Sequence, residues 1–90
     1  MNTQPQAGLI WRQSLGALEC YEARITTTWS EYIGGVVIAQ ESERPESGYT
    51  AYVEYFKHGV ARQLWGGRIF EDCDQAKIWC EGEVARLRGA

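Results

Sequence analysis

The chain has 90 residues, enough for one domain, and 44% of them are hydrophobic, including four Trp, five Tyr and two Phe. This composition excludes a wholly disordered protein, and the longest apolar run, Ile33 to Ala39, is far shorter than the ~20 residues of a membrane-spanning helix. The formal net charge of −3 disfavours broad neutralisation of phosphates, so nucleic-acid binding would require a local basic patch.

Residues 1–8 are polar and contain one proline, which predicts a disordered N-terminal lead before a single domain at residues 9–90. The first residues lack the basic start and apolar segment of a secretory signal, so a cytoplasmic location is expected. Three cysteines and a single histidine, His58, match no zinc or redox spacing. We therefore expect no metal and no cofactor.

The first half of the chain predicts two strands and a short extended segment. Residues Leu9 to Gln13 form the short segment, and the alternating, β-branched stretch from Ala17 to Thr28 predicts a strand. After a turn at "WSEYIGG", residues Tyr32 to Glu41 predict the next strand. Its paired glycines, Gly34 and Gly35, indicate a bulge or a close approach of another backbone.

A loop and a hairpin follow. The loop "SERPESG" has the proline, serine and glycine typical of a chain reversal. Beyond it, residues Tyr49 to Phe56 and Val60 to Trp65 predict an antiparallel hairpin, because His58 and Gly59 supply a backbone that permits a tight turn.

The last segment predicts a helix. Asp72 is a good N-cap with Gln75 three residues later, and the last turn is basic. A single apolar face is expected, formed by Cys73, Ala76, Cys80, Val84 and Leu87. Gly82 costs a helix about 1 kcal/mol relative to alanine, so we expect a close neighbour there. The predicted fold is α+β: an antiparallel three- or four-stranded β-meander packed against one C-terminal α-helix.

The aromatic residues exceed what one helix can cover. In the predicted strand Tyr49 to Phe56, bulky side chains occupy both faces, whereas a sheet with one solvated face normally alternates cleanly. Either the N-terminal arm around Trp11 covers the surplus or it forms a contact patch, where aromatic side chains act as anchors. Trp29 and Tyr32, placed in a turn, are the other pair expected to be exposed.

Acidic residues suggest a second component of a contact surface. Glu41, Glu43 and Glu46 lie in one loop with only Arg44 opposing them, so the loop could imitate phosphates and occupy a basic groove on a partner. Ordinary solvation of the loop is the alternative. The predicted partner-binding residues are Trp29, Tyr32, Glu41, Glu43, Glu46 and Tyr52.

The segment "GGRIFEDCDQAKIWCEGEVAR", with "YTAYVEYFKHG" before it, resembles small phage and prophage accessory proteins, in which a β-meander leads into an "EEAK…CE…AR" helix. The matching positions are Gly66, Gly67, Phe70, Ala76, Lys77, Cys80, Glu81, Ala85 and Arg86. Several small acidic members of this group are inhibitors of bacterial defence, anti-CRISPR proteins among them. The resemblance implies a bacterial host and stoichiometric binding to a nuclease complex, such as a CRISPR effector, whose nucleic-acid path or partner site it blocks.

Three alternatives remain beside this inhibitor hypothesis. The chain could be a small nucleic-acid-binding module that stacks bases on the sheet aromatics and holds phosphates with Arg62, Arg68, Arg86 and Arg88. It could also be a structural homodimer without an inhibitory role. An enzyme is disfavoured, because no nucleophile or orienting carboxylate has a recognisable motif around His58.

Overall fold

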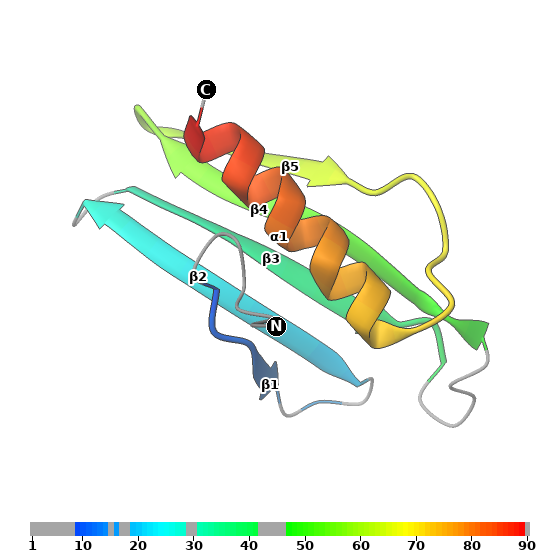
Figure 1. Cartoon of the computed structure of the whole chain (residues 1–90). Helices are drawn as coiled ribbons and strands as arrows, with labels where there is room; N and C mark the ends of the chain where they lie inside the picture. Colours follow the sequence, from blue (N-terminus) through cyan, green and yellow to red (C-terminus); the bar gives the residue numbers. More distant parts are fainter. Residues whose placement is uncertain (1–8, 15, 17–18, 29–30, 42–46, 90) are drawn as a thin grey trace, which may run out of the picture.

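The computed structural model describes residues 9–14, 16, 19–28, 31–41 and 47–89, and it has the predicted α+β architecture. The strands are β1 (Arg12–Ser14), β2 (Cys20–Thr28), β3 (Glu31–Ala39), β4 (Tyr49–Lys57) and β5 (Val60–Trp65), and the helix is α1 (Cys73–Gly89). They form one antiparallel sheet in the order β1-β2-β3-β4-β5, with the helix across one face (Figure 1).

The expected three or four strands are thus corrected to five. The additional strand comes from the short N-terminal segment, because Arg12, Gln13 and Ser14 pair with β2 and form one edge of the sheet. The second strand begins at Cys20, and its predicted first residues, 17 and 18, lie outside the described part of the chain, as does the predicted lead at 1–8.

The hairpin of β4 and β5 is confirmed, and a left-handed turn closes it. His58 and Gly59 have φ angles of 55° and 77°, and Lys57 pairs directly with Val60. Two consecutive left-handed residues match the right-handed twist of the flanking strands, which explains why this two-residue connection is favoured.

The start of the helix follows the predicted capping pattern. The backbone N–H of Gln75 donates a hydrogen bond to Asp72 Oδ1 at 2.8 Å, and Asp74 lies in the first turn. Both carboxylates therefore face the positive end of the helix dipole, while Arg86 and Arg88 occupy its last turn.

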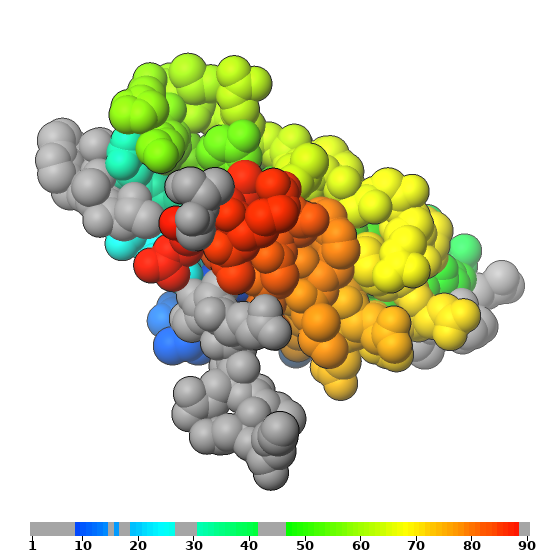
Figure 2. All heavy atoms as spheres, turned by 45° about the horizontal axis from the view of Figure 1, so that its top comes forward, coloured from blue at the N-terminus to red at the C-terminus, as the bar shows by residue number. Residues whose placement is uncertain are grey.

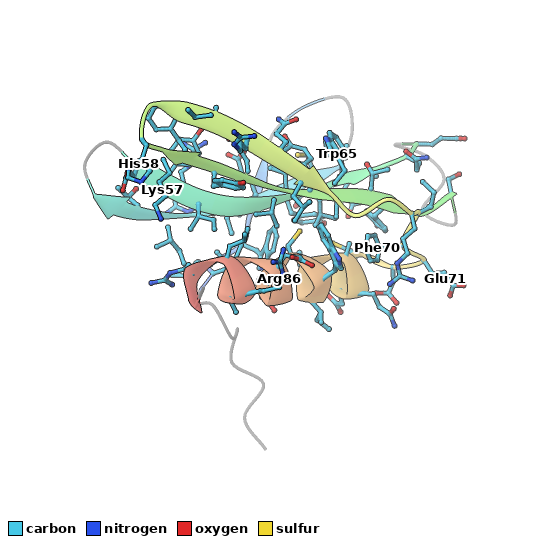
Figure 3. The ribbon with its side chains drawn as sticks, turned by 90° about the horizontal axis from the view of Figure 1, so that it is seen from above. Lys57, His58, Trp65, Phe70, Glu71 and Arg86 are labelled. Carbon is cyan, nitrogen blue, oxygen red and sulfur yellow. The ribbon has the colours of Figure 1, made fainter. Side chains whose placement is uncertain are left out.

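The core lies between the sheet and the helix, which form two layers in Figure 3. Ala76, Cys80 and Val84 of α1 are fully buried against Val37 and Val53 of the two strands beneath the helix. Complete burial of one such valine contributes ~1.5–3 kcal/mol. Cys73 and Leu87 are half-buried at the two ends of the same helix face, so the predicted apolar face of the helix is confirmed.

The paired glycines mark close approaches: of the β2 backbone at Gly34, as one of the two alternatives predicted, and of side chains at Gly35. A Cβ at Gly35 would lie 2.8 Å from Cys80 Cβ and 2.9 Å from Trp11 Cη2, and one at Gly34 would overlap the Ala23 carbonyl oxygen. The β2–β3 register runs without a break through both glycines, so the expected bulge is wrong there; the irregularity lies between Thr26 and Thr28.

One other expectation is wrong, and one of two alternatives is not supported by the described residues. Gly82 of the helix has no neighbour within 4 Å of where a Cβ would be, so it does not serve a close contact. Trp11 packs on the helix side of the sheet, where Leu9 is also buried, so this part of the N-terminal arm does not cover the opposite face. No helix among the described residues is long and apolar enough to cross a membrane.

Candidate binding surface

The face of the sheet opposite the helix, here called the open face, carries the unexplained aromatic residues. Tyr52 and Phe56 of β4 alternate with core residues and therefore point away from the helix, as do Tyr32 of β3 and Trp65 of β5 through the strand register. Figure 3 shows Trp65 on the side of the sheet away from α1. No second layer of described residues covers this face.

The four rings of the open face form two pairs between neighbouring strands. Tyr32 and Phe56 stack with ring centroids 5.9 Å apart and planes 14° apart, and Tyr52 lies 4.4 Å from Trp65 at a tilt of 39°. Such geometries add ~0.5–1.5 kcal/mol beyond area burial. Trp65 nevertheless remains 52% exposed, because β5 is the last strand of the sheet.

A hollow of about 540 Å³ opens beside these rings on the same face. Gly34 lies at its floor, because the register places it between Arg24 of β2 and Glu54 of β4. Tyr32, Val36 and Tyr52 contribute the apolar walls, with Ile10 and Arg12 at the side of β1. A side chain at position 34 would collide with the backbone of β2, since its Cβ would overlap the Ala23 carbonyl oxygen.

Two of the charged residues of the hollow, Arg24 and Glu54, belong to one connected network. Arg24 Nη2 lies 3.5 Å from Glu54 Oε1, and the Arg24 guanidinium lies over the Tyr32 ring at 4.0 Å. Tyr32 Oη donates to Glu54 Oε1 at 3.2 Å, and Gln63 Nε2 donates to Glu54 Oε2 at 3.4 Å. The network positions polar groups beside the aromatic pairs and leaves the hollow electrically balanced.

The structure brings two of the predicted partner-binding residues together. Tyr32 and Tyr52 both line the hollow. Tyr32 lies in β3 and not in a turn, so that part of the expectation is wrong, and it is half-buried because Arg24 covers its ring. Glu41 is exposed beyond the opposite end of β3, away from Tyr32, while Trp29, Glu43 and Glu46 lie outside the described residues.

Sequence reasoning did not find the charged part of this surface. Arg24 and Glu54 cannot be matched to each other from the sequence, because only the strand register shows that both lie beside Gly34. One signal was available: in "CYEARIT" the charged residues alternate with the apolar ones that build the core, which assigns Glu22 and Arg24 to the open face. This alternation does not show which residue of a neighbouring strand lies close to Arg24.

The thiols and the histidine have ordinary structural environments. Cys80 is fully buried, with Sγ 3.7 Å from the Tyr52 carbonyl oxygen, and burial raises the pKa of its thiol to about 12. Burial also raises the pKa of Cys73. His58 occupies the hairpin turn, with Nδ1 3.9 Å from Glu31 Oε2. Among the described residues, no cluster of three or more His, Cys, Asp or Glu is arranged to hold a metal ion.

Comparison of the chain with protein-family models, with curated proteins and with solved structures finds no match. The geometry of the open face therefore carries the functional argument.

Proposed function

We propose that this protein is a stoichiometric binding protein that docks on another protein through the open face of its sheet. The observation that carries the proposal is the combination of two aromatic pairs with a hollow on a face that no second layer of described helices or strands covers. Tyr, Trp and Arg dominate the energetics of protein interfaces, and such anchors insert into or surround pockets. Here Tyr52, Trp65 and Arg24 supply all three side-chain types.

The charge pattern favours a protein partner over a nucleic acid. Arg12 and Arg24 on the hollow are balanced by Glu22 and Glu54, so the surface offers no net attraction to a phosphate chain. The four arginines of the nucleic-acid hypothesis lie elsewhere: Arg62 follows the parity of the helix side of β5, Arg68 lies over the Phe70 ring, and Arg86 and Arg88 lie on α1. Base stacking and phosphate binding would thus use different sides of the molecule.

For the class of partner, we propose a nuclease complex of a bacterial defence system, with a CRISPR effector as the first candidate. The resemblance of residues 66–86 to phage and prophage accessory proteins supports this target, and the net charge of −3 of the whole chain favours its approach to a basic complex. The mechanism is occlusion: the open face docks on the complex and blocks a path or a partner site.

An interference assay tests this function with matched variants. Expression of the chain should restore plaque formation by a phage that the host's CRISPR system targets. Tyr52→Ser should remove most of this protection, because it deletes a ring of the open face. Ile78→Ser is the control: Ile78 is 65% exposed on α1, so an apolar side chain is lost without touching the open face. The proposal fails if Tyr52→Ser folds and protects as well as Ile78→Ser does.

A second candidate, binding of single-stranded nucleic acid, is favoured by one observation, the stacked rings on neighbouring strands. A filter-binding titration with a labelled oligonucleotide separates the two candidates. Retention that falls steeply with salt would support the nucleic-acid module, whereas no retention at about 50 mM salt would exclude it, since phosphate contacts are strongest at low salt.

A further inference from the structure

Strand β5 forms a sheet edge that is exposed along its whole length. Within the described part of the chain it pairs with β4 alone, and all six of its residues are exposed. The helix lies over β3 and β4, so it does not cover β5. Figure 2 shows β5 in yellow-green along the rim of the molecule, beside the helix in orange and red. A long exposed edge is a template for pairing with another strand.

The direction of each backbone group along β5 follows from one hydrogen bond. The N–H of Gly66 donates to the Ala51 carbonyl oxygen at 2.9 Å, which continues the β4–β5 ladder by one pair. Because hydrogen-bonded pairs alternate in an antiparallel ladder, Arg62 and Leu64 also direct their N–H and C=O groups toward β4. Ala61, Gln63 and Trp65 therefore direct theirs outward, to the edge.

We propose that this edge pairs antiparallel with β5 of a second copy of the chain, in a register centred on Gln63. The twofold axis then passes between the two Gln63 residues, and Ala61 of each copy lies opposite Trp65 of the other. Each of the three outward-directed residues then forms a hydrogen-bonded pair with a residue of the second copy, and the three pairs give six new backbone hydrogen bonds. The product is a ten-stranded sheet with both helices on one side.

The side chains on the helix side of β5 disfavour the alternative register centred on Arg62. Residues that lie opposite each other must share a face of the sheet. The twofold axis must therefore relate two copies of the same residue, and it cannot lie between two consecutive residues of the strand. An axis at Arg62 would place two guanidinium groups directly opposite each other, which is destabilising. With the axis at Gln63, Arg62 faces Leu64 of the second copy, and no two like charges are directly opposed within the strand.

The open face supports the same register. In one copy Tyr52 is adjacent to Trp65, and Ala61 is adjacent to Phe56. Across the interface the exposed indole of Trp65 would lie over Ala61 of the second copy, whose small side chain leaves room for it, with the Phe56 ring beyond. The aromatic pairs of both copies thus join into one strip. This inference does not depend on the proposed function, and its test uses the isolated chain.

Sedimentation equilibrium with two substitutions at one position tests the pairing. The parent chain should be dimeric at concentrations well below about 1 mM. Gln63→Pro removes the outward N–H while leaving the bonds to β4 intact, and proline is tolerated at such edge positions, so this variant should be a folded monomer. Gln63→Ala is the control, because it loses the same side chain and keeps the N–H, and it should dimerise. A monomeric parent, or a folded Gln63→Pro variant that dimerises equally well, would overturn the proposal.

Cysteine cross-linking tests the register, and it remains decisive if Gln63→Pro fails to fold. In a Cys20→Ser, Cys73→Ser background, Gln63→Cys should give a disulfide-linked dimer on mild oxidation, since opposed Cα atoms are about 5.5 Å apart. Arg62→Cys should not, because its Cα would lie ~8 Å from its counterpart. Cross-linking of Arg62→Cys alone, or of neither variant, contradicts the register centred on Gln63.

Discussion

Gly35 is the point where β3, the helix and the N-terminal segment come together, because only a residue without a side chain fits between them. The Cys80 Cβ and the Trp11 indole occupy the two positions nearest to its missing Cβ. Trp11 is also held by the helix, since its Nε1 donates a hydrogen bond to Glu81 Oε2 at 3.0 Å. One glycine thus allows the helix and the indole to pack on the sheet together.

Replacing this glycine should destabilise the fold. We expect Gly35→Ala to lower the free energy of unfolding by ~1–3 kcal/mol, because both neighbours must move to accommodate the methyl group. Gly82→Ala is the matched control in open space: it should raise stability by up to about 1 kcal/mol through helix propensity. Urea unfolding followed by circular dichroism measures both. Equal stabilities of Gly35→Ala and the parent chain would show that the helix does not approach β3 this closely.

Tyr21 gives the protein a dependence on alkaline pH. Its Oη donates to Glu19 Oε2 at 2.5 Å, and this bond, with burial and the negative charge of Glu19, raises the pKa of Tyr21 from 10.0 to about 12. The fold favours the protonated phenol, so its contribution to stability is complete below pH 10 and is lost between about pH 10 and 12. Tyr21→Phe should therefore weaken the fall in unfolding free energy over this interval, as urea titrations at pH 9, 10 and 11 would show. An unchanged slope would contradict the Glu19 bond.

At the scale of the elements, the sequence pattern predicted those features that depend on residues close together in the chain. The Asp72 cap, the helix face through Ala76 and Cys80, and the His58–Gly59 turn all depend on residues a few positions apart, so their patterns are visible in the sequence. The sequence pattern predicts the short segment at Leu9 to Gln13, earlier than β1 at Arg12–Ser14, because a three-residue strand has no periodicity.

The helix cap provides a test at this scale. Asp72→Ala should lower the free energy of unfolding by about 1 kcal/mol, because the Gln75 N–H loses its 2.8 Å acceptor. Asp74→Ala is the comparison: it removes an equal charge from the first turn, where the dipole effect is ~0.3–1 kcal/mol. Thermal unfolding of both variants should rank Asp72→Ala as the less stable. The reverse order would mean that charge, and not the hydrogen bond, dominates at this end of the helix.

At the scale of the whole molecule, the surplus of aromatic residues was visible in the sequence, but its arrangement was not. Alternation assigned Tyr52 and Phe56 to one side of a strand, whereas the pairing of Tyr52 with Trp65 and the salt bridge over Gly34 depend on registers between four strands. Long-range register follows from the packing of all elements together. For the same reason, sequence patterns could not show that Trp11 would join the helix side.

Amide hydrogen exchange tests both the direction of the N–H groups along β5 and the proposed pairing with a second copy. In a dilute sample, Arg62 and Leu64 should exchange slowly because their N–H groups point into the β4 ladder. Ala61, Gln63 and Trp65 should exchange rapidly, since theirs point to the edge. As the concentration rises, the second group should gain protection and the first should change little, because dimerisation occupies only outward-directed groups. Uniform exchange along β5 at low concentration would contradict the assigned directions, and protection independent of concentration would mean that this edge does not pair with a second copy.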